Sequence, residues 1–195
     1  AARSEADAKR SPLRWYPYQK GGEAVKWFGN NEWVLEWKDD GAAVKGNIDL
    51  RTLRVRSHNY NGSYSFREGI TWSSFSNGGL AFRYVPAGSL FDSTGSMAFA
   101  SSHLFGYLAL LNTPSAFRFL KAYSPSPRIK IESLLAIPDI IENQDVNELE
   151  ALARECVQIA SEINRHDEAS PGFAISAAED LISANAPRVR IQAWI

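Results

Sequence analysis

In the first half of the chain the pattern of hydrophobic and polar positions favours β-strands. The runs "GITWSSF" (69–75) and "LAFRYV" (80–85) flank the turn signal Asn77-Gly78-Gly79, which is typical of a hairpin. A second turn signal, Asn61-Gly62, divides the run "RVRSHNYNGSYSF" (54–66). The pattern therefore predicts two hairpins in this half.

Helical periodicity replaces this pattern after residue 100. Apolar residues recur at helical spacing over 103–112, and Thr113-Pro114 is typical of the N-cap and first residue of another helix, 114–123. A short strand is predicted at 128–131 and a turn of helix at 132–136.

The clearest predicted helix spans 145–165. Its apolar residues step by three and four positions, as in a heptad seam: Leu149, Leu152, Cys156, Ile159 and Ile163. A seam this narrow favours pairing with another long helix, or cover by the tail at 173–195. The alternative is an amphipathic helix that lies on its own domain.

These elements predict an α/β fold of the α+β type. A curved, mixed and largely antiparallel sheet is expected from 15–100, with helices packed beside it and a long spacer-type helix after them. Residues 1–14 are interpreted as a linker or frayed N-terminal extension, 15–140 as the main domain, and 141–195 as the long helix and C-terminal tail.

Composition is that of one domain with an appendage: 195 residues, 45% hydrophobic and 12% aromatic. The net charge of −1 conceals an asymmetry. Residues 1–140 carry 17 Lys and Arg against 12 Asp and Glu, a surplus of +5, whereas 141–195 carry 4 against 10, a balance of −6. Such a split indicates two surfaces with different partners. The alternative is an uneven spread without functional meaning.

No catalytic or metal-binding set stands out. One Cys and three separate His make neither a disulfide framework nor a metal-ligand spacing, and the expected compartment is the cytoplasm. No apolar run approaches the roughly 20 residues that cross a membrane. Because the chain begins Ala1-Ala2-Arg3 without Met, we interpret it as part of a longer protein. Glu36 and Lys38 match half of a nuclease motif, without a convincing upstream Asp.

Basic residues gather in the region of predicted strands: Lys45, Arg51, Arg54, Arg56 and Arg67. Arg54 and Arg56 alternate, so a strand would point both to one face. Arg can hold phosphates or guanine, Asn can bind adenine, and aromatic rings can stack on a base, so the mixture suits a nucleic-acid surface. The alternative is a solvated strand face.

Two groups of motifs match known proteins. Residues 107–140, with Leu111-Asn112-Thr113 after one helix and Leu134 to Pro138 before the next, resemble the second half of target recognition domains in type I restriction specificity subunits. In those domains a long spacer helix follows, and 145–165 occupies its place.

Other motifs occur in order between residues 15 and 99: Trp15, Tyr18, Lys20-Gly21-Gly22, Lys26 to Asn30, Trp37, Asp40-Gly41, Glu68 to Ser73, Arg83-Tyr84 and Phe91-Asp92. With 107–140 they resemble the C-terminal region of PglX-type adenine-specific DNA methyltransferases. That family belongs to BREX phage-defence systems and is related to fused restriction-methylation enzymes. The resemblance covers about 15–170.

This resemblance implies that 15–140 is a target recognition domain for duplex DNA. A methyltransferase domain upstream of Ala1 would flip an adenine and methylate it with S-adenosylmethionine. The Asn-Pro-Pro-Tyr/Phe signature and a Gly-rich S-adenosylmethionine loop are absent here, so we expect no cofactor and no catalytic residue in this chain. The expected partners are double-stranded DNA, the methyltransferase domain and, through the long helix, a second copy.

The expected DNA contacts fall into two classes. Lys20 and Lys26 are candidates for phosphate contacts, and Gly21-Gly22 is interpreted as a tight turn. Base readout is expected from Arg51, Arg54, Arg56, Arg67, Asn59 or Asn61. Four aromatic residues are predicted to be core rather than stacking platforms: Trp15, Trp27, Phe28 and Trp33.

Two other functions stay open. A β-rich module could bind carbohydrate or protein through exposed Trp and Tyr, and its affinity would then be insensitive to salt. A nuclease built on Glu36 and Lys38 would cleave DNA only with a divalent metal.

Overall fold

The computed structural model describes residues 4–57, 62–74, 79–123, 125–126, 128–141, 145–168, 170 and 173. Within these residues the strands are β1 (Trp15–Gln19), β2 (Val34–Glu36), β3 (Gly69–Trp72), β4 (Phe82–Val85), β5 (Leu90–Phe91) and β6 (Met97–Ala98). The helices are α1 (Glu5–Arg10), α2 (Lys38–Lys45), α3 (Leu104–Leu111), α4 (Pro114–Tyr123), α5 (Ile131–Leu135) and α6 (Asn147–Asn164), with a 3₁₀ turn at Gly62–Tyr64. The predicted α+β class is confirmed.

The described strands form two three-stranded sheets rather than one curved sheet. In the first, ordered β2-β1-β5, β2 pairs antiparallel to β1 and β5 pairs parallel to it. The second, ordered β4-β3-β6, is antiparallel throughout. The largely antiparallel pairing is therefore as predicted, and the predicted hairpin of 69–75 and 80–85 is present as β3 and β4.

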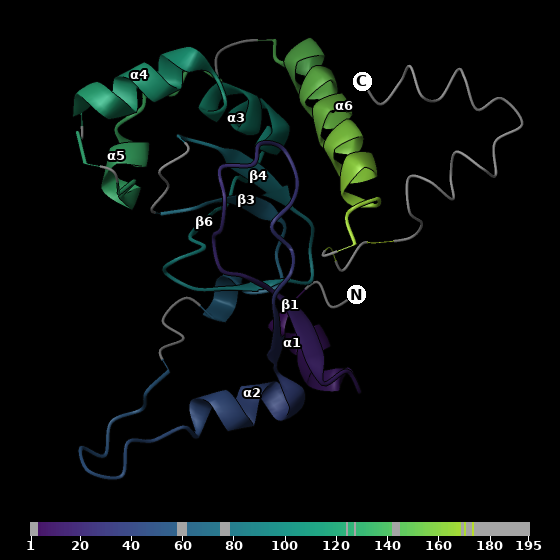
Figure 1. Cartoon of the computed structure of the whole chain (residues 1–195), viewed down its shortest axis with the longest axis vertical. Coiled ribbons are helices and arrows are strands. Elements are labelled where there is room, and N and C mark those ends of the chain that lie inside the picture. Colours follow the sequence, from purple (N-terminus) through teal and green to yellow (C-terminus); the bar gives the residue numbers. More distant parts are fainter. Residues whose placement is uncertain are drawn as a thin grey trace, which may run out of the picture.

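The larger core lies between the β4-β3-β6 sheet and three helices, α3, α4 and α6 (Figure 1). Trp72 and Phe82 from neighbouring strands are fully buried, with ring centroids 5.9 Å apart. Helix α3 contributes Leu108, and α6 contributes Ala153 and Val157. Helix α6 thus packs on its own domain through one face.

A smaller core joins α1 to the first sheet, and its buried residues are Ala8, Tyr16, Trp37, Phe66 and Leu90. Residues 5–10, expected as a linker or frayed helix, form α1 because Ser4 caps it: the Ser4 side chain accepts a hydrogen bond from Asp7 N–H at 3.2 Å. Helix α2 lies beside α1, at the opposite end of the molecule from α3 and α4 (Figure 1).

The helices after residue 100 follow the sequence prediction closely. The two predicted helices are α3 and α4, and the predicted N-cap is present: Thr113 Oγ1 accepts from Ala116 N–H at 3.1 Å. The helical turn at 132–136 is α5.

Two predicted strands are wrong. Residues 54–56 contribute only an isolated bridge between Ile48 and Val55. The predicted strand at 128–131 is mostly a loop, in which Ile129 N–H donates to Ser74 O at 3.0 Å. Isolated contacts of this kind satisfy a backbone group without extending a ladder. The turn signal Asn77-Gly78, like Asn61, lies outside the described residues.

The Gly21-Gly22 pair ends β1 and turns the chain, as predicted. Both glycines have left-handed φ, +83° and +124°, and a Cβ on Gly21 would lie 2.9 Å from Thr94 O. Main-chain carbonyls of the loop after this turn accept hydrogen bonds from Arg83 of β4. Its guanidinium donates to Glu23 O at 3.3 Å and to Val25 O at 3.4 Å. The glycine pair is therefore structural.

Asn112 links β4 to the end of α3. Its Oδ1 accepts from Phe82 N–H at 3.1 Å, and its Nδ2 donates to Phe82 O at 3.0 Å and to Leu108 O at 3.2 Å. Trp27 completes the same strand edge, because its N–H donates to Phe82 O and its carbonyl accepts from Tyr84 N–H. A buried side-chain amide thus substitutes for a missing strand.

Asp92, directly after β5, links that strand to its neighbour β1. Its carboxylate accepts from Tyr18 OH at 2.8 Å, and also from Thr94 Oγ1 and the Thr94 and Gly95 N–H groups. Burial raises the pKa of Asp92, but these hydrogen bonds outweigh it and hold that pKa below its usual value. Burial, followed by the hydrogen bond to the Asp92 carboxylate, raises the pKa of Tyr18.

We expect Asp92→Asn to reduce the dependence of stability on pH. Because the folded pKa of Asp92 lies below the unfolded one, its contribution is present above the unfolded pKa of about 4 and is lost as the pH falls through the folded pKa. Urea unfolding from about pH 6 to about pH 3 should therefore show a smaller loss of stability in Asp92→Asn than in the wild type. Tyr18→Phe, which deletes one donor, should fall between them; parallel curves for all three proteins would contradict this assignment.

Candidate nucleic-acid interface

A narrow hairpin projects beyond α2, and we call residues 47–56 the arginine hairpin (Figure 1). Asp49 N–H donates to Arg54 O at 2.9 Å, and Arg56 N–H donates to Asn47 O at 2.8 Å. The Ile48–Val55 bridge lies between these bonds. The hairpin is thus a short two-stranded turn held by two backbone hydrogen bonds on either side of one isolated bridge.

Asp49 organises the turn at its tip. Its Oδ1 accepts from Thr52 N–H at 3.0 Å and from Arg51 N–H at 2.9 Å, while its main-chain oxygen accepts from Leu53 N–H at 2.8 Å. The Thr52 and Arg51 amides hold the pKa of Asp49 below its usual value. The tip is therefore a defined loop around an ionised carboxylate.

Three arginines meet on this hairpin. Arg56 Nη2 lies 3.3 Å from Asp49 Oδ2, and this ion pair neutralises the charge of Asp49, the one acidic residue of the hairpin. Arg51 and Arg54 are exposed, and their side chains form no hydrogen bond or ion pair with any described residue. The hairpin thus carries three of the five basic residues that the sequence groups together, and they lie along a turn rather than on one strand face. With three arginines and one aspartate, the hairpin carries a net charge of +2.

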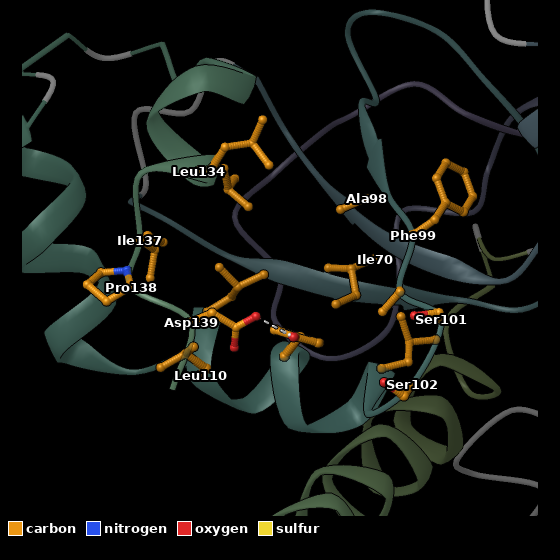
Figure 2. A pocket seen from close by; sticks show the side chains of 15 residues that line it. Ile70, Ala98, Phe99, Ser101, Ser102, Leu110, Leu134, Ile137, Pro138 and Asp139 are labelled. Carbon is orange, nitrogen blue, oxygen red and sulfur yellow. Dashed lines mark hydrogen bonds between the residues drawn. The ribbon is translucent and has the colours of Figure 1, made fainter. Parts of the chain in front are cut away.

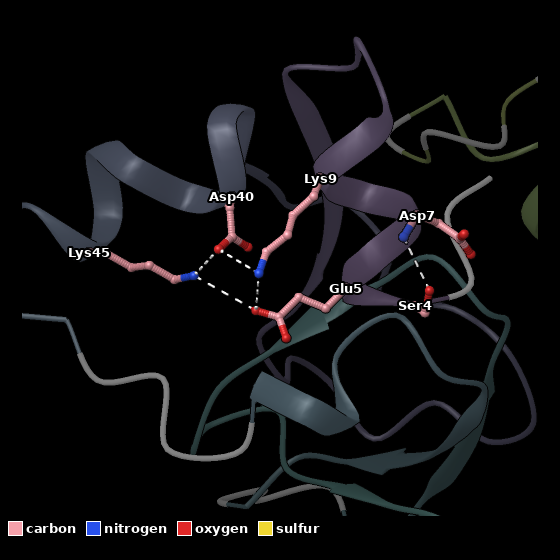
Figure 3. Close-up of polar contacts among 6 residues, drawn as sticks. All are labelled: Ser4, Glu5, Asp7, Lys9, Asp40 and Lys45. Carbon is pink, nitrogen blue, oxygen red and sulfur yellow. Dashed lines mark hydrogen bonds and ion pairs between the residues drawn. The ribbon is translucent and has the colours of Figure 1, made fainter.

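The base of the hairpin is anchored by a network between α1 and α2 (Figure 3). Asp40 accepts from Lys45 Nζ at 2.8 Å and from Lys9 Nζ at 3.3 Å, and both ammonium groups lie 3.8 Å from Glu5. Desolvation raises the pKa of Asp40, but the two lysines outweigh it and lower that pKa. Lys45, predicted as part of the basic cluster, is thus occupied in holding α2.

Lys20 lies beside an exposed aromatic ring. Its Nζ is 4.8 Å from the centroid of the Trp33 ring. A similar pair follows α1, where Arg14 lies 5.4 Å from the ring of Trp15. Cation–π pairs at exposed sites contribute roughly 0.5–1 kcal/mol, so these cations stay accessible to a ligand.

The prediction that all four aromatic residues are core is wrong for two of them. Trp15 is 54% exposed and Trp33 is 52% exposed, whereas Trp27 and Phe28 pack against the larger core. Side chains alternate across β1, and Tyr16 takes the inward position next to Trp15. Only the pairing of β1 decided which of the two neighbours is buried.

Lys26 and Arg67 each have partners within the domain. Lys26 Nζ donates to Asn112 O at 2.9 Å, where the partial negative charge of the α3 C-terminus lies. The Arg67 guanidinium is exposed and lies 5.2 Å from the Tyr64 ring and 5.7 Å from the Phe99 ring. The predicted contacts therefore do not form one cluster: Lys26 bonds at the C-terminus of α3, and Figure 1 shows α3 at the opposite end of the molecule from α2 and the hairpin.

Leu50 and Leu53 are exposed at the hairpin tip, and neither is among the residues predicted from the sequence to contact DNA. The available signal was the alternation of leucine and arginine in "DLRTLR" after a residue that caps turns, Asp49. Asn59 and Asn61, predicted to contact bases, lie outside the described residues.

A cavity of about 360 Å³ opens between β3, β6, α3 and α5 (Figure 2). Its wall is mostly apolar and includes Ile70, Leu134 and Ile137. Tyr107 OH donates to Asp139 Oδ2 at 2.7 Å at one side. Residues 134–138, which resemble the exit of a type I recognition domain, thus form part of this cavity.

A larger cavity, about 780 Å³, separates the 22–32 loop from α6. Cys156, Ile159 and Ile163 of the predicted seam line it, and Leu149 and Leu152 are also exposed. The core-facing side of α6 therefore differs from the seam. The tail at 173–195, which is one of the two predicted covers of the seam beside a second helix, lies outside the described residues apart from residue 173.

The described part of the chain holds no group of three or more His, Cys, Asp or Glu placed to bind a metal ion. Glu36, half of the nuclease motif, accepts instead from Arg14 Nε at 3.0 Å. Among the described helices, none has the length and apolar character needed to cross a bilayer.

Two sequence relatives of this chain are adenine-specific methyltransferases. Over 126 residues, 64% of its length, the chain is 49% identical to the adenine-specific methyltransferase PglX of Lacticaseibacillus casei (strain Zhang). Over 151 residues, 75% of its length, it is 32% identical to the adenine-specific methyltransferase BrxX of Escherichia coli O9:H4 (strain HS). Its homologues are adenine-specific methyltransferases. The chain spans about a tenth of the length of these relatives, 10% and 12% respectively, and it matches no protein-family model.

Proposed function

We propose that this chain is the sequence-specific DNA recognition domain of an adenine-specific DNA methyltransferase. It corresponds to the C-terminal target recognition region, and the parent enzyme acts in a BREX phage-defence system or a related restriction-modification system. The observation that carries the proposal is the arginine hairpin, a cationic ribbon in a homologue of PglX and BrxX. The major groove of DNA admits a two-stranded ribbon.

Each candidate residue takes a defined role in this proposal. Arg51 and Arg54 bind DNA directly, because neither has a side-chain partner among the described residues. Lys20 and Arg67 are accessible and contact phosphates, whereas Lys26 stabilises the end of α3. S-adenosylmethionine and the methyl-transfer residues belong to the methyltransferase domain of the parent, whose Asn-Pro-Pro-Tyr/Phe signature is absent here. The seam of α6 contacts that domain, or a second copy in the isolated chain.

The test is the salt dependence of duplex binding. The wild-type chain is expected to lose affinity steeply as salt rises, because each phosphate contact contributes about −0.9 to the slope of log K against log salt. The double variant Arg51→Ala/Arg54→Ala should weaken binding and reduce that slope by up to about 1.8. Fluorescence anisotropy with a labelled duplex, between about 50 and 200 mM salt, measures both.

Arg118→Ala is the matched control, because Arg118 is an exposed arginine on α4 at the far end of the molecule. It should leave the slope unchanged. Failure of the wild type to bind any duplex would contradict the proposal. Salt-insensitive binding to a carbohydrate or protein, lost in Trp15→Ala or Trp33→Ala, would instead support the β-module alternative that these exposed rings favour.

A further inference from the structure

The tip of the arginine hairpin exposes two large apolar side chains. Leu50 is 90% exposed and Leu53 is 79% exposed, and neither belongs to the two hydrophobic cores. Presenting leucine to water carries a free-energy cost, which a partner with an apolar interior would relieve.

The leucines are held in place by their turn. Leu53 has a left-handed φ of +53°, a conformation that residues other than glycine rarely adopt. Its N–H donates to Asp49 O at 2.8 Å, and Asp49 Oδ1 accepts the two amides between the leucines. The loop therefore presents Leu50 and Leu53 on a defined scaffold, at the cost of a strained residue.

Arginines alternate with these leucines along the tip. Arg51 lies between the leucines and Arg54 follows them, while the Asp49 carboxylate is already matched by Arg56. A partner that fits must therefore be anionic outside and apolar inside. A DNA duplex has this build, because its phosphates surround stacked bases with apolar faces.

Resting on the DNA-binding role proposed above, we infer that Leu50 and Leu53 insert into the base stack of the bound duplex while Arg51 and Arg54 hold the flanking phosphates. Leucine is among the side chains with which proteins wedge open a base step and kink the duplex. Opening the stack next to an adenine lowers the cost of extruding that base. The hairpin thus has a mechanical role in addition to its electrostatic one.

The experiment uses a duplex that the wild-type chain enriches from a random-sequence pool. 2-Aminopurine replaces each adenine of this duplex in turn, since its fluorescence rises when the base loses its stacking neighbours. Wild-type chain is expected to raise the fluorescence at one step. Leu50→Ser/Leu53→Ser should abolish the rise but leave the salt slope unchanged, because all arginines remain. Leu135→Ser is the matched control, a leucine that is 80% exposed on α5, and should keep the full rise.

The outcomes separate the two proposals. A wild-type chain that enriches no duplex overturns the DNA-binding role and the insertion together. A chain that enriches a duplex but gives no fluorescence rise at any adenine, or the same rise in Leu50→Ser/Leu53→Ser, overturns the insertion alone. Loss of the salt slope in the leucine variant would show that the hairpin has collapsed. The single variants Leu50→Ala and Leu53→Ala, chosen because they keep the wild-type slope, would then replace it. An unchanged fluorescence rise in both single variants overturns the insertion.

Discussion

Asn112→Ala is expected to lower the free energy of unfolding by about 2–4 kcal/mol. The buried amide of Asn112 supplies an acceptor for Phe82 N–H at 3.1 Å and a second donor for Phe82 O at 3.0 Å. Without it, a donor in a fully buried strand edge has no partner, and an unsatisfied buried group costs about 1–3 kcal/mol. The lost bond to Leu108 O and the space left behind add to this. Urea unfolding followed by tryptophan fluorescence measures the change.

Asn147→Ala is the control for this substitution. Asn147 is exposed at the start of α6 and, among the described residues, its side chain bonds only to Asp145, so its loss should change stability by less than about 0.5 kcal/mol. Equal stabilities for the two variants would mean that water satisfies the edge of β4. Asn112→Asp should lie nearer to Ala than to the wild type, because it keeps an acceptor but loses both amide donor bonds.

Arg83→Met is expected to destabilise the fold by about 2–4 kcal/mol although it preserves much of the side-chain volume. Arg83 is 1% exposed, and burial lowers its pKa to about 10 while Glu32 opposes the shift, so the side chain is charged at neutral pH. Its charged donors reach Glu23 O, Val25 O and, at 3.5 Å, Ser73 Oγ. Methionine would leave both carbonyls without this donor.

Arg83→Lys separates charge from geometry. Lysine keeps the charge but presents one compact ammonium instead of a planar fork, so it should recover only part of the lost stability. Arg118→Met, at an exposed arginine on α4, is the surface control and should be close to neutral. Full recovery by Arg83→Lys would contradict the role of the fork, and a neutral Arg83→Met would contradict the role of the charge.

Local signals explain most of the correct predictions. Thr113-Pro114 determines where α4 begins, because the Thr113 hydroxyl caps the helix and proline has the required φ. The Gly21-Gly22 turn depends on backbone conformations that other residues rarely adopt. The strand pair of β3 and β4 follows from two runs of strand-forming residues around a turn signal. All three depend on residues close together in sequence.

The wrong predictions concern pairing over longer distances. Arg54 and Arg56 have strand-like neighbours, but the chain pairs with itself at Ile48 and Val55 and closes a turn instead. Trp15 is predicted from the sequence to be core, yet the register of β1 turns Tyr16 inward instead. Hydrophobicity predicts that a segment has buried residues. The register of the strand determines which of two neighbouring residues is the buried one.

The sequence by itself determined the α+β class, the helices after residue 100 and the basic character of the segment around Arg51, because propensity, capping and charge act over a few residues. Tertiary structure alone decided that the strands divide into two sheets and that Asn112 completes the edge of β4. It also placed Leu50 and Leu53 outside both cores, on a hairpin anchored through α2 to α1. Burial depends on contacts between residues far apart in sequence, which no local pattern records.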